Sequence, residues 1–126
     1  MLSGKDTIVE DSILTIDGEE VIDIRWRINE LALIDSSPDI RWVVTIGHND
    51  GTNINIYQAE SKCTHVKGIT PESVPEDAIA FDPYLSPRGT DKSFYELMKD
   101  GTRKEYSPRT FVMCKFLKFS PILTLL

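Results

Sequence analysis

Residues 41–58 read RWVVTIGHNDGTNINIYQ, and this stretch decides the fold. Aliphatic and polar residues alternate on both sides of the turn signal Asn49-Asp50-Gly51. Such alternation, with a period of two, is typical of half-buried strands, and a short segment with Asp-Gly between two of them is typical of a hairpin. The sequence therefore predicts an antiparallel hairpin, with strands over 41–48 and 52–58.

The length of the loop decides which side chains of this hairpin share a face, because a slip of one residue inverts a strand. A two-residue loop would pair Ile46 with Asn55 and mix polar with apolar partners. A three-residue loop pairs Ile46 with Ile54 and places Gly51 where a bulge needs a left-handed residue. We therefore expect a three-residue loop, with one aliphatic face and one face that carries Thr45, Asn53, Asn55 and Tyr57.

A second hairpin is expected upstream of the first. Residues 22–29 alternate strictly between apolar and polar side chains, and Asp17-Gly18 suits the two positive φ angles of a type I′ turn. Strands over 12–16 and 20–29 would then pair. A two-residue loop places Ile13 opposite Ile22 and a four-residue loop places it opposite Ile24, and the pattern leaves both registers open.

Prolines dominate the stretch 64–90, which holds Pro71, Pro75, Pro83 and Pro87. Their spacing excludes a long helix or a central strand, although Pro71 could begin one helical turn. Irregular connections of this length are uncommon in compact domains and are often functional. The stretch is interpreted either as a binding loop or as an ordered segment that covers one face of the sheet.

The chain after residue 90 is expected to contain a helix and then a strand. A short helix is predicted at about 92–100, capped by Thr90 or Asp91 and ended by Gly101 in a left-handed conformation. Residues 109–119 have apolar side chains on both alternating sets, which favours a strand in the middle of the sheet. The apolar tail 122–126 is expected to dock as a last strand; the alternative is a patch covered by a second copy in a homodimer.

These elements make one α+β domain over residues 1–126. The expected architecture is a predominantly antiparallel sheet built from two hairpins and a C-terminal strand, with one short helix and a long proline-rich loop. The 126 residues are 40% hydrophobic and 27% charged, as in ordinary globular domains. No apolar run approaches the roughly 18 residues that a membrane span needs. We also see no secretory signal at the N-terminus and no disulfide framework, so we expect a cytoplasmic protein.

The net charge of −6 conceals an uneven distribution along the chain. Residues 1–40 hold ten acidic and three basic residues, whereas residues 101–126 hold one acidic and five basic residues. An acidic domain is repelled by polyanions, which argues against a nucleic-acid partner. The acidic surface would instead suit a basic protein, although a merely solvated surface is the more common reading of such charge. The candidate partner-binding residues are Asp17, Glu19, Glu20, Asp23, Glu76, Asp77 and Tyr84.

The sequence contains no nucleophile-elbow, dinucleotide-binding or phosphate-loop motif. Its best candidate for a reactive constellation is Cys63-Thr64-His65, with His48 and Cys114 as the only other soft ligands. Two cysteines and two histidines are the right number for zinc, but they lack the paired spacing of structural zinc sites. We therefore expect no catalytic residue, no metal and no cofactor.

The favoured hypothesis is a non-catalytic protein-interaction module. An inhibitor, an immunity-type protein or an assembly subunit that binds a larger, basic partner would fit. The alternative is a small enzyme or ligand-binding domain with a pocket between the sheet and the 64–90 loop, in which Cys63 and His65 would act.

Overall fold

The computed structural model describes residues 7–21, 38–66, 69, 71–78 and 81–125. The strands are β1 (Thr7–Ile16), β2 (Glu19–Glu20), β3 (Ile40–Asn49), β4 (Ile54–His65), β5 (Leu85–Pro87) and β6 (Leu123–Leu125). The helices are α2 (Phe94–Asp100) and α3 (Pro108–Leu117), with 3-10 turns η2 (Pro71–Ser73) and η3 (Arg103–Glu105). The α+β class with a mostly antiparallel sheet is confirmed. No helix in these ranges is long and apolar enough to cross a membrane.

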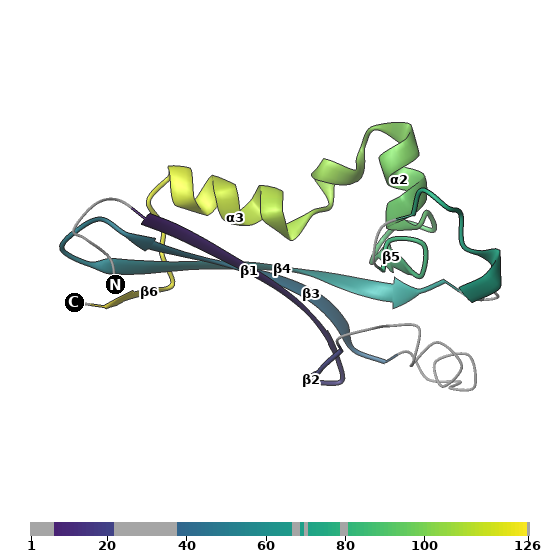
Figure 1. Ribbon diagram of the computed structural model, residues 1–126, viewed down its shortest axis with the longest axis horizontal. Coiled ribbons are helices and arrows are strands. Elements are labelled where there is room, and N and C mark those ends of the chain that lie inside the picture. The colour runs from purple at the N-terminus through teal and green to yellow at the C-terminus, as the bar shows by residue number, and fades with distance from the viewer. Residues whose placement is uncertain (1–6, 22–37, 67–68, 70, 79–80, 126) are drawn as a thin grey trace.

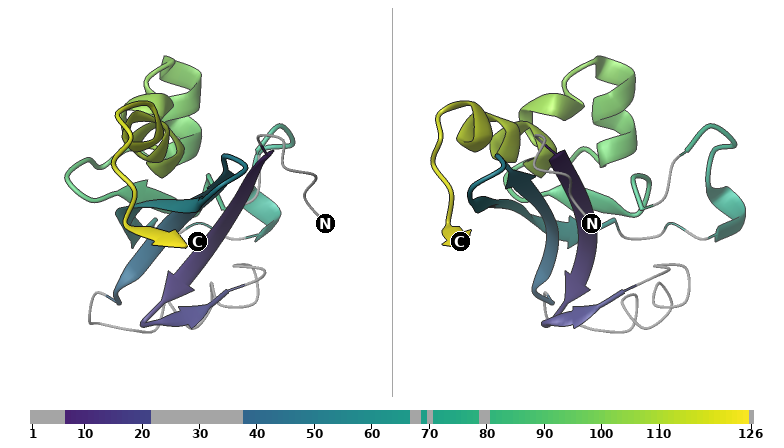
Figure 2. Two further views of the ribbon diagram at one scale, coloured as in Figure 1. Left: turned by 90° about the vertical axis from the view of Figure 1, so that its left-hand side faces the viewer. Right: turned by 60° about the vertical axis from the view of Figure 1, so that its left-hand side comes forward.

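The six strands form one antiparallel sheet in the order β2-β1-β3-β4-β5, and β6 pairs with β4 as well. β5 and β6 lie near opposite ends of β4 (Figure 1). The sheet is strongly curved, and α2 and α3 lie on the same side of it (Figure 2). The helices therefore cover one face, which we call the inner face, and the other face is the outer face.

The central hairpin forms as expected, but its register differs from the predicted one. Ile46 lies opposite Tyr57 and not opposite Ile54, so the predicted three-residue loop is wrong. The Asp50 carboxylate accepts hydrogen bonds from the backbone N–H groups of Thr52 and Asn53, at 2.9 and 2.7 Å. These bonds stabilise a longer turn, which an aspartate at this position favours.

This shift of three residues inverts β4. Asn55 and Tyr57 are buried on the inner face, with 1% and 0% of their surface exposed. Ile54 and Ile56, which we expected on the aliphatic face with Ile46, lie on the outer face and are only half-buried. The prediction for Gly51 is correct in one respect, since its φ of 92° is left-handed.

The first hairpin has the two-residue loop. Asp17 and Gly18 have φ angles of 49° and 85°, and Thr15 lies opposite Glu20. These angles are the ones that a type I′ turn requires. The strand expected over 22–29 lies outside the described residues, beyond β2.

The predicted central strand over 109–119 is wrong, because these residues form α3. The Ser107 side chain accepts a hydrogen bond from the N–H of Arg109, and Pro108 occupies the first turn of the helix. A serine cap followed by proline is a strong start signal for a helix. Val112 is buried against the sheet, whereas Leu117 is 77% exposed. The apolar side chains of this stretch therefore lie on both the buried and the exposed side of one helix, and not on the two faces of a strand.

The shorter helix and the tail agree with the sequence more closely. α2 occupies the expected range and ends at Gly101, whose φ is 78°. Its cap is Ser93, in a capping box with Glu96, and not Thr90 or Asp91. The tail docks as β6, with Leu123 opposite Ile56 on β4.

A cluster around Trp42 holds the helical layer on the sheet. The Trp42 ring contacts Phe81 and Phe94 edge to face, at centroid distances of 5.1 and 5.3 Å. The guanidinium of Arg103 lies 5.0 Å from the Trp42 ring and makes two 2.9 Å hydrogen bonds to the buried Asp82 carboxylate. Arg103 belongs to η3, so this contact positions the turn that leads into α3.

Candidate functional site

The middle of β4 has an open edge within the described part of the chain. β6 pairs with residues 54–56 and β5 with residues 63–65. Between them, Gln58 O accepts a 2.8 Å bond from Lys115 Nζ, and Lys62 O accepts a 2.8 Å bond from the N–H of Arg88. Alternate residues of an antiparallel strand direct their backbone groups to the same side. The N–H and C=O groups of Glu60 therefore face this edge too.

A groove of about 350 Å³ runs beside this edge. Its lining comes from β4, from the end of β5 and from the helical layer: Glu60, Ser61, Lys62, Pro87, Arg88, Tyr106 and Phe111. The groove therefore combines a strand edge with residues that are distant in sequence, which is the usual composition of a binding site on a small domain.

The helical wall of the groove is apolar and firmly attached. Ser61 Oγ donates a 2.6 Å hydrogen bond to Tyr106 O, which ties the chain just after η3 to β4. Phe111 is 38% exposed and precedes Lys115 by one helical turn on α3. An aromatic wall thus stands beside free backbone groups.

The opposite side of the groove carries cations. Cys63 pairs with Pro87, and the N–H of Arg88 bonds to Lys62 O, so the pairing extends by one more residue on each strand. Lys62 and Arg88 therefore lie side by side on the outer face. Both are exposed, and within the described residues neither side chain has an ion-pair partner. Glu60, by contrast, accepts a 2.9 Å bond from Arg41.

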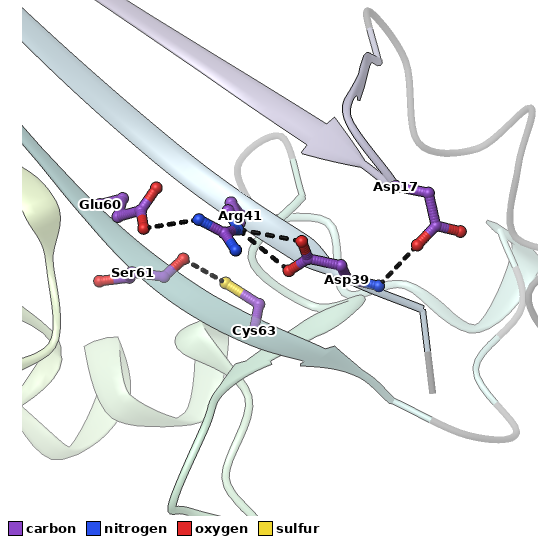
Figure 3. A network of polar contacts seen from close by, with 6 residues as sticks. All are labelled: Asp17, Asp39, Arg41, Glu60, Ser61 and Cys63. Carbon is purple, nitrogen blue, oxygen red and sulfur yellow. Dashed lines mark hydrogen bonds and ion pairs between the residues drawn. The ribbon is translucent and has the colours of Figure 1, made fainter. Parts of the chain in front are cut away.

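Arg41 joins Glu60 to a second carboxylate. Its Nε donates to both oxygens of Asp39, at 3.0 and 3.1 Å (Figure 3). The hydrogen bond from Arg41 holds the pKa of Asp39 below its usual value, and the positive charges of Lys62 and Arg88 lower it further. Arg41 therefore already engages both the Asp39 and the Glu60 carboxylates.

The acidic residues expected to bind a partner lie outside the groove. Asp17 is at the β1–β2 turn, where its Oδ1 accepts a 2.9 Å bond from the N–H of Asp39 (Figure 3). Glu19 and Glu20 form β2 and are exposed. Asp23 lies outside the described residues.

The remaining candidates are placed near η2 and in the core. Glu76 is exposed, and Asp77 contacts Lys99 and Tyr95, the latter at 2.8 Å from the phenol oxygen. The hydrogen bonds from Lys99 and Tyr95 lower the pKa of Asp77. Tyr84 is only 2% exposed, so its side chain belongs to the core and not to a surface.

The Cys63–His65 pair does not form a reactive site. The two residues share the inner face of β4, but Cys63 is fully buried and its thiol donates to Ser61 O at 3.4 Å (Figure 3). Burial raises the pKa of the Cys63 thiol to about 12, so the thiolate is scarce at neutral pH. Within the described ranges, no three His, Cys, Asp or Glu side chains gather as metal ligands would.

Sequence reasoning offered a pocket between the sheet and the 64–90 loop but missed the helical wall of this groove, because α3 was predicted as a strand. Phe111 was expected within a central strand, where it would have been covered. Ser107-Pro108 was the signal that could have corrected this, since it marks the start of a helix. No local pattern indicates that Lys62 and Arg88 become neighbours, because β5 brings them together across the proline-rich segment.

No protein-family model matches the chain, and no curated protein matches it.

Proposed function

We propose that this protein is a non-catalytic protein-interaction module that binds an extended segment of a partner protein at the open edge of β4. The observation that carries the proposal is the position of Glu60, whose backbone groups face a groove between β5 and β6. An exposed strand edge pairs readily with another chain, and main-chain hydrogen bonds supply affinity in such complexes.

The dimensions of the edge limit the bound segment. The stretch 57–62 between the two pairings spans about 20 Å at roughly 3.3 Å per residue. Because Gln58 O and Lys62 O already accept bonds from Lys115 and Arg88, the segment would pair with the N–H and C=O of Glu60. It would then leave the plane of the sheet, because β5 and β6 occupy the same edge on either side. Aromatic side chains of the helical wall, Tyr106 and Phe111, would contact every second residue.

The decisive experiment compares Glu60→Pro with Glu60→Ala. Proline removes the N–H that faces the groove and is tolerated at an open edge, whereas alanine keeps this N–H and removes the same carboxylate. Both variants lose the Arg41 contact, so they differ mainly in the backbone donor. We expect affinity capture from the native source, followed by mass spectrometry, to recover a partner with wild type and Glu60→Ala but not with Glu60→Pro.

A second variant guards against a folding defect in Glu60→Pro. Phe111→Ala leaves the strand intact and should also reduce capture, because it removes the exposed wall of the groove. Circular dichroism checks that each variant is folded. A partner that stays bound to both Glu60→Pro and Phe111→Ala would exclude the open edge as the binding site.

The exposed carboxylates at the β1–β2 turn support a further part of the proposal, an inhibitor or immunity-type role against a basic partner. Glu19 and Glu20 lie on one short strand beside Asp17. Negative charges gathered on a surface accelerate association with a basic protein, and salt weakens this effect. We expect Glu19→Lys with Glu20→Lys to slow association and to flatten its salt dependence; unchanged association rates would exclude this surface.

A ligand-binding domain is the second candidate, and the presence of Pro87 and Arg88 of the proline-rich stretch in the groove lining supports it. A small anion held by Arg88 would not need the backbone of Glu60. Binding that survives Glu60→Pro but is lost in Arg88→Ala would favour this candidate over strand addition.

Self-association through the tail is a separate proposal. Leu123 and Leu125 are 52% and 45% exposed although β6 is paired with β4. Native mass spectrometry of wild type and of Leu123→Ser with Leu125→Ser tests it. A monomer at all concentrations would exclude the homodimer.

A further inference from the structure

The groove beside β4 is locally positive although the protein carries a net charge of −6. Lys62 comes from β4, Arg88 from the residue after β5, and Lys115 from α3. These three cations border the open edge, and none of them pairs with a carboxylate within the described residues. Cations from three elements have thus been brought to one edge without a carboxylate in direct contact among the described residues.

The neighbouring carboxylates do not neutralise this edge. Asp39 and Glu60 are the acidic groups beside it, and both are engaged by Arg41. Exposed like charges repel, so an added negative group would be favourable at Lys62 and Arg88.

We propose that the segment bound at the β4 edge is acidic, with a carboxylate side chain placed between Lys62 and Arg88. This inference rests on the proposed function, since it specifies the chemistry of the segment that the open edge would bind. Charge complementarity with the unpaired cations identifies the occupant as an acidic stretch of a partner protein.

The geometry of a strand also specifies the pattern of that segment. Lys62 and Arg88 lie on the outer face, whereas Tyr106 and Phe111 belong to the helical layer on the inner face. Successive side chains of an extended segment point to opposite faces. The bound segment therefore alternates acidic residues towards the outer face with apolar residues towards the aromatic wall.

Two blocked synthetic peptides test this pattern. The first has the sequence Gly-Val-Glu-Val-Glu-Val-Gly, and the second replaces both glutamates by lysine. Titration into ¹⁵N-labelled full-length protein follows the backbone amides of Gln58, Glu60 and Lys62 by NMR. We expect the glutamate peptide to shift these amides and to bind about tenfold more tightly than the lysine peptide, as two exposed ion pairs allow. Higher salt should narrow the difference.

Charge reversal provides the matched control. Lys62→Glu with Arg88→Glu should lower affinity for the glutamate peptide about tenfold and raise affinity for the lysine peptide. The control, Lys92→Glu with Lys99→Glu, makes the same change in net charge just before α2 and on its last turn, away from the groove lining. It should leave the preference unchanged.

The outcomes separate this inference from the proposed function. Equal affinity of both peptides, with shifts at Glu60, would keep strand addition and overturn the acidic preference. Shifts at these amides from inorganic phosphate alone, at the same concentration, would show that the cations bind any anion and would also overturn it. No shift at Glu60 with either peptide would overturn both the inference and strand addition.

Discussion

Two aromatic clusters lie between the helices and the sheet, and they differ in whether their polar atoms have hydrogen-bond partners. In the cluster around Trp42, the indole Nε1 donates to Ser12 Oγ at 2.7 Å and Arg103 is bound by Asp82. In the other, Phe116 contacts the Tyr57 ring edge to face, at a centroid distance of 5.3 Å. There Tyr57 OH and Asn55 Nδ2 are buried with no hydrogen-bond partner among the described residues.

The difference shows which part of the fold is specified by polar contacts. A buried polar atom without a partner costs free energy, whereas a partnered one adds specificity. The Trp42 cluster combines packing with directional bonds and anchors η3 to the sheet. The Tyr57 cluster relies more on packing: the Asn55 side-chain oxygen accepts a 2.8 Å bond from Thr124 Oγ1 of β6, but Tyr57 OH and Asn55 Nδ2 have no partner among the described residues.

Replacing Trp42 by alanine should have the largest effect on stability. The ring is 1% exposed and contacts two other aromatic rings, so its removal leaves a large cavity. We expect a loss of about 3–5 kcal/mol in the free energy of unfolding. Urea denaturation followed by far-UV circular dichroism measures it. A loss below about 1 kcal/mol would remove the distinction between the two clusters.

The reactivity of the Cys63 thiol measures how well the C-terminal end of β4 is shielded from water. Its pKa is raised from about 9 to about 12, so its thiolate fraction near pH 8 is lower by about a thousandfold than that of an ordinary thiol. Cys114 is exposed on α3 and serves as the internal control. Iodoacetamide should alkylate Cys114 in the folded protein and both thiols in urea, as peptide mass spectrometry will show. Similar rates at both sites in the folded protein would contradict the burial of Cys63.

The sign of the linked pH effect follows from the same shift. A thiol whose pKa is raised by folding contributes its full stability below the unfolded value, near 9. This contribution is lost as the pH rises from about 9 to about 12. Cys63→Ala should lack this part of the alkaline loss of stability.

Asp82→Asn should have an intermediate effect. The carboxylate is nearly buried, with 4% of the side chain exposed, and it binds an Arg103 side chain that is 26% exposed. Losing the charge should reduce the free energy of unfolding by about 2 kcal/mol, less than for a fully buried pair, since Arg103 regains some solvation. In a double-mutant cycle with Arg103→Met, a coupling free energy near zero would show that the pair does not position η3.

Tyr57→Phe should have the smallest effect. It removes a hydroxyl group that has no partner among the described residues and keeps the ring against Phe116. We expect the free energy of unfolding to change by less than about 0.5 kcal/mol, or to rise slightly. Urea denaturation of the variant and of wild type, measured side by side, gives this change in the free energy of unfolding. A loss above about 1 kcal/mol would mean that the hydroxyl is bonded and that the two clusters are alike.

Much of the fold could be predicted because local chemistry decides it. Asp17-Gly18 needs two positive φ angles, and Gly101 ends a helix in the left-handed region, so both turns follow from residue type. The alternation in 41–58 predicted a hairpin correctly. Its register did not follow, because the loop length depends on hydrogen bonds from Thr52 and Asn53 to Asp50.

The site was less accessible to sequence reasoning. We expected Phe111 in a strand because apolar residues occupy both alternating sets in 109–119. A helix with an exposed apolar surface produces the same pattern. The acidic residues that stand out in the sequence lie on β2 and near η2, away from the groove. The cations that border it are single residues from separate elements.

The sequence by itself determined an α+β fold with an antiparallel sheet, the type I′ turn at Asp17-Gly18 and the approximate range of its shorter helix. These features depend on periodicity, on capping residues and on left-handed glycines, which act over a few neighbouring residues. The tertiary structure alone decided which face of β4 is buried, where β5 and β6 stop along its edge, and which cations meet there. Those outcomes depend on pairing between distant segments, where a shift in register moves every side chain on a strand.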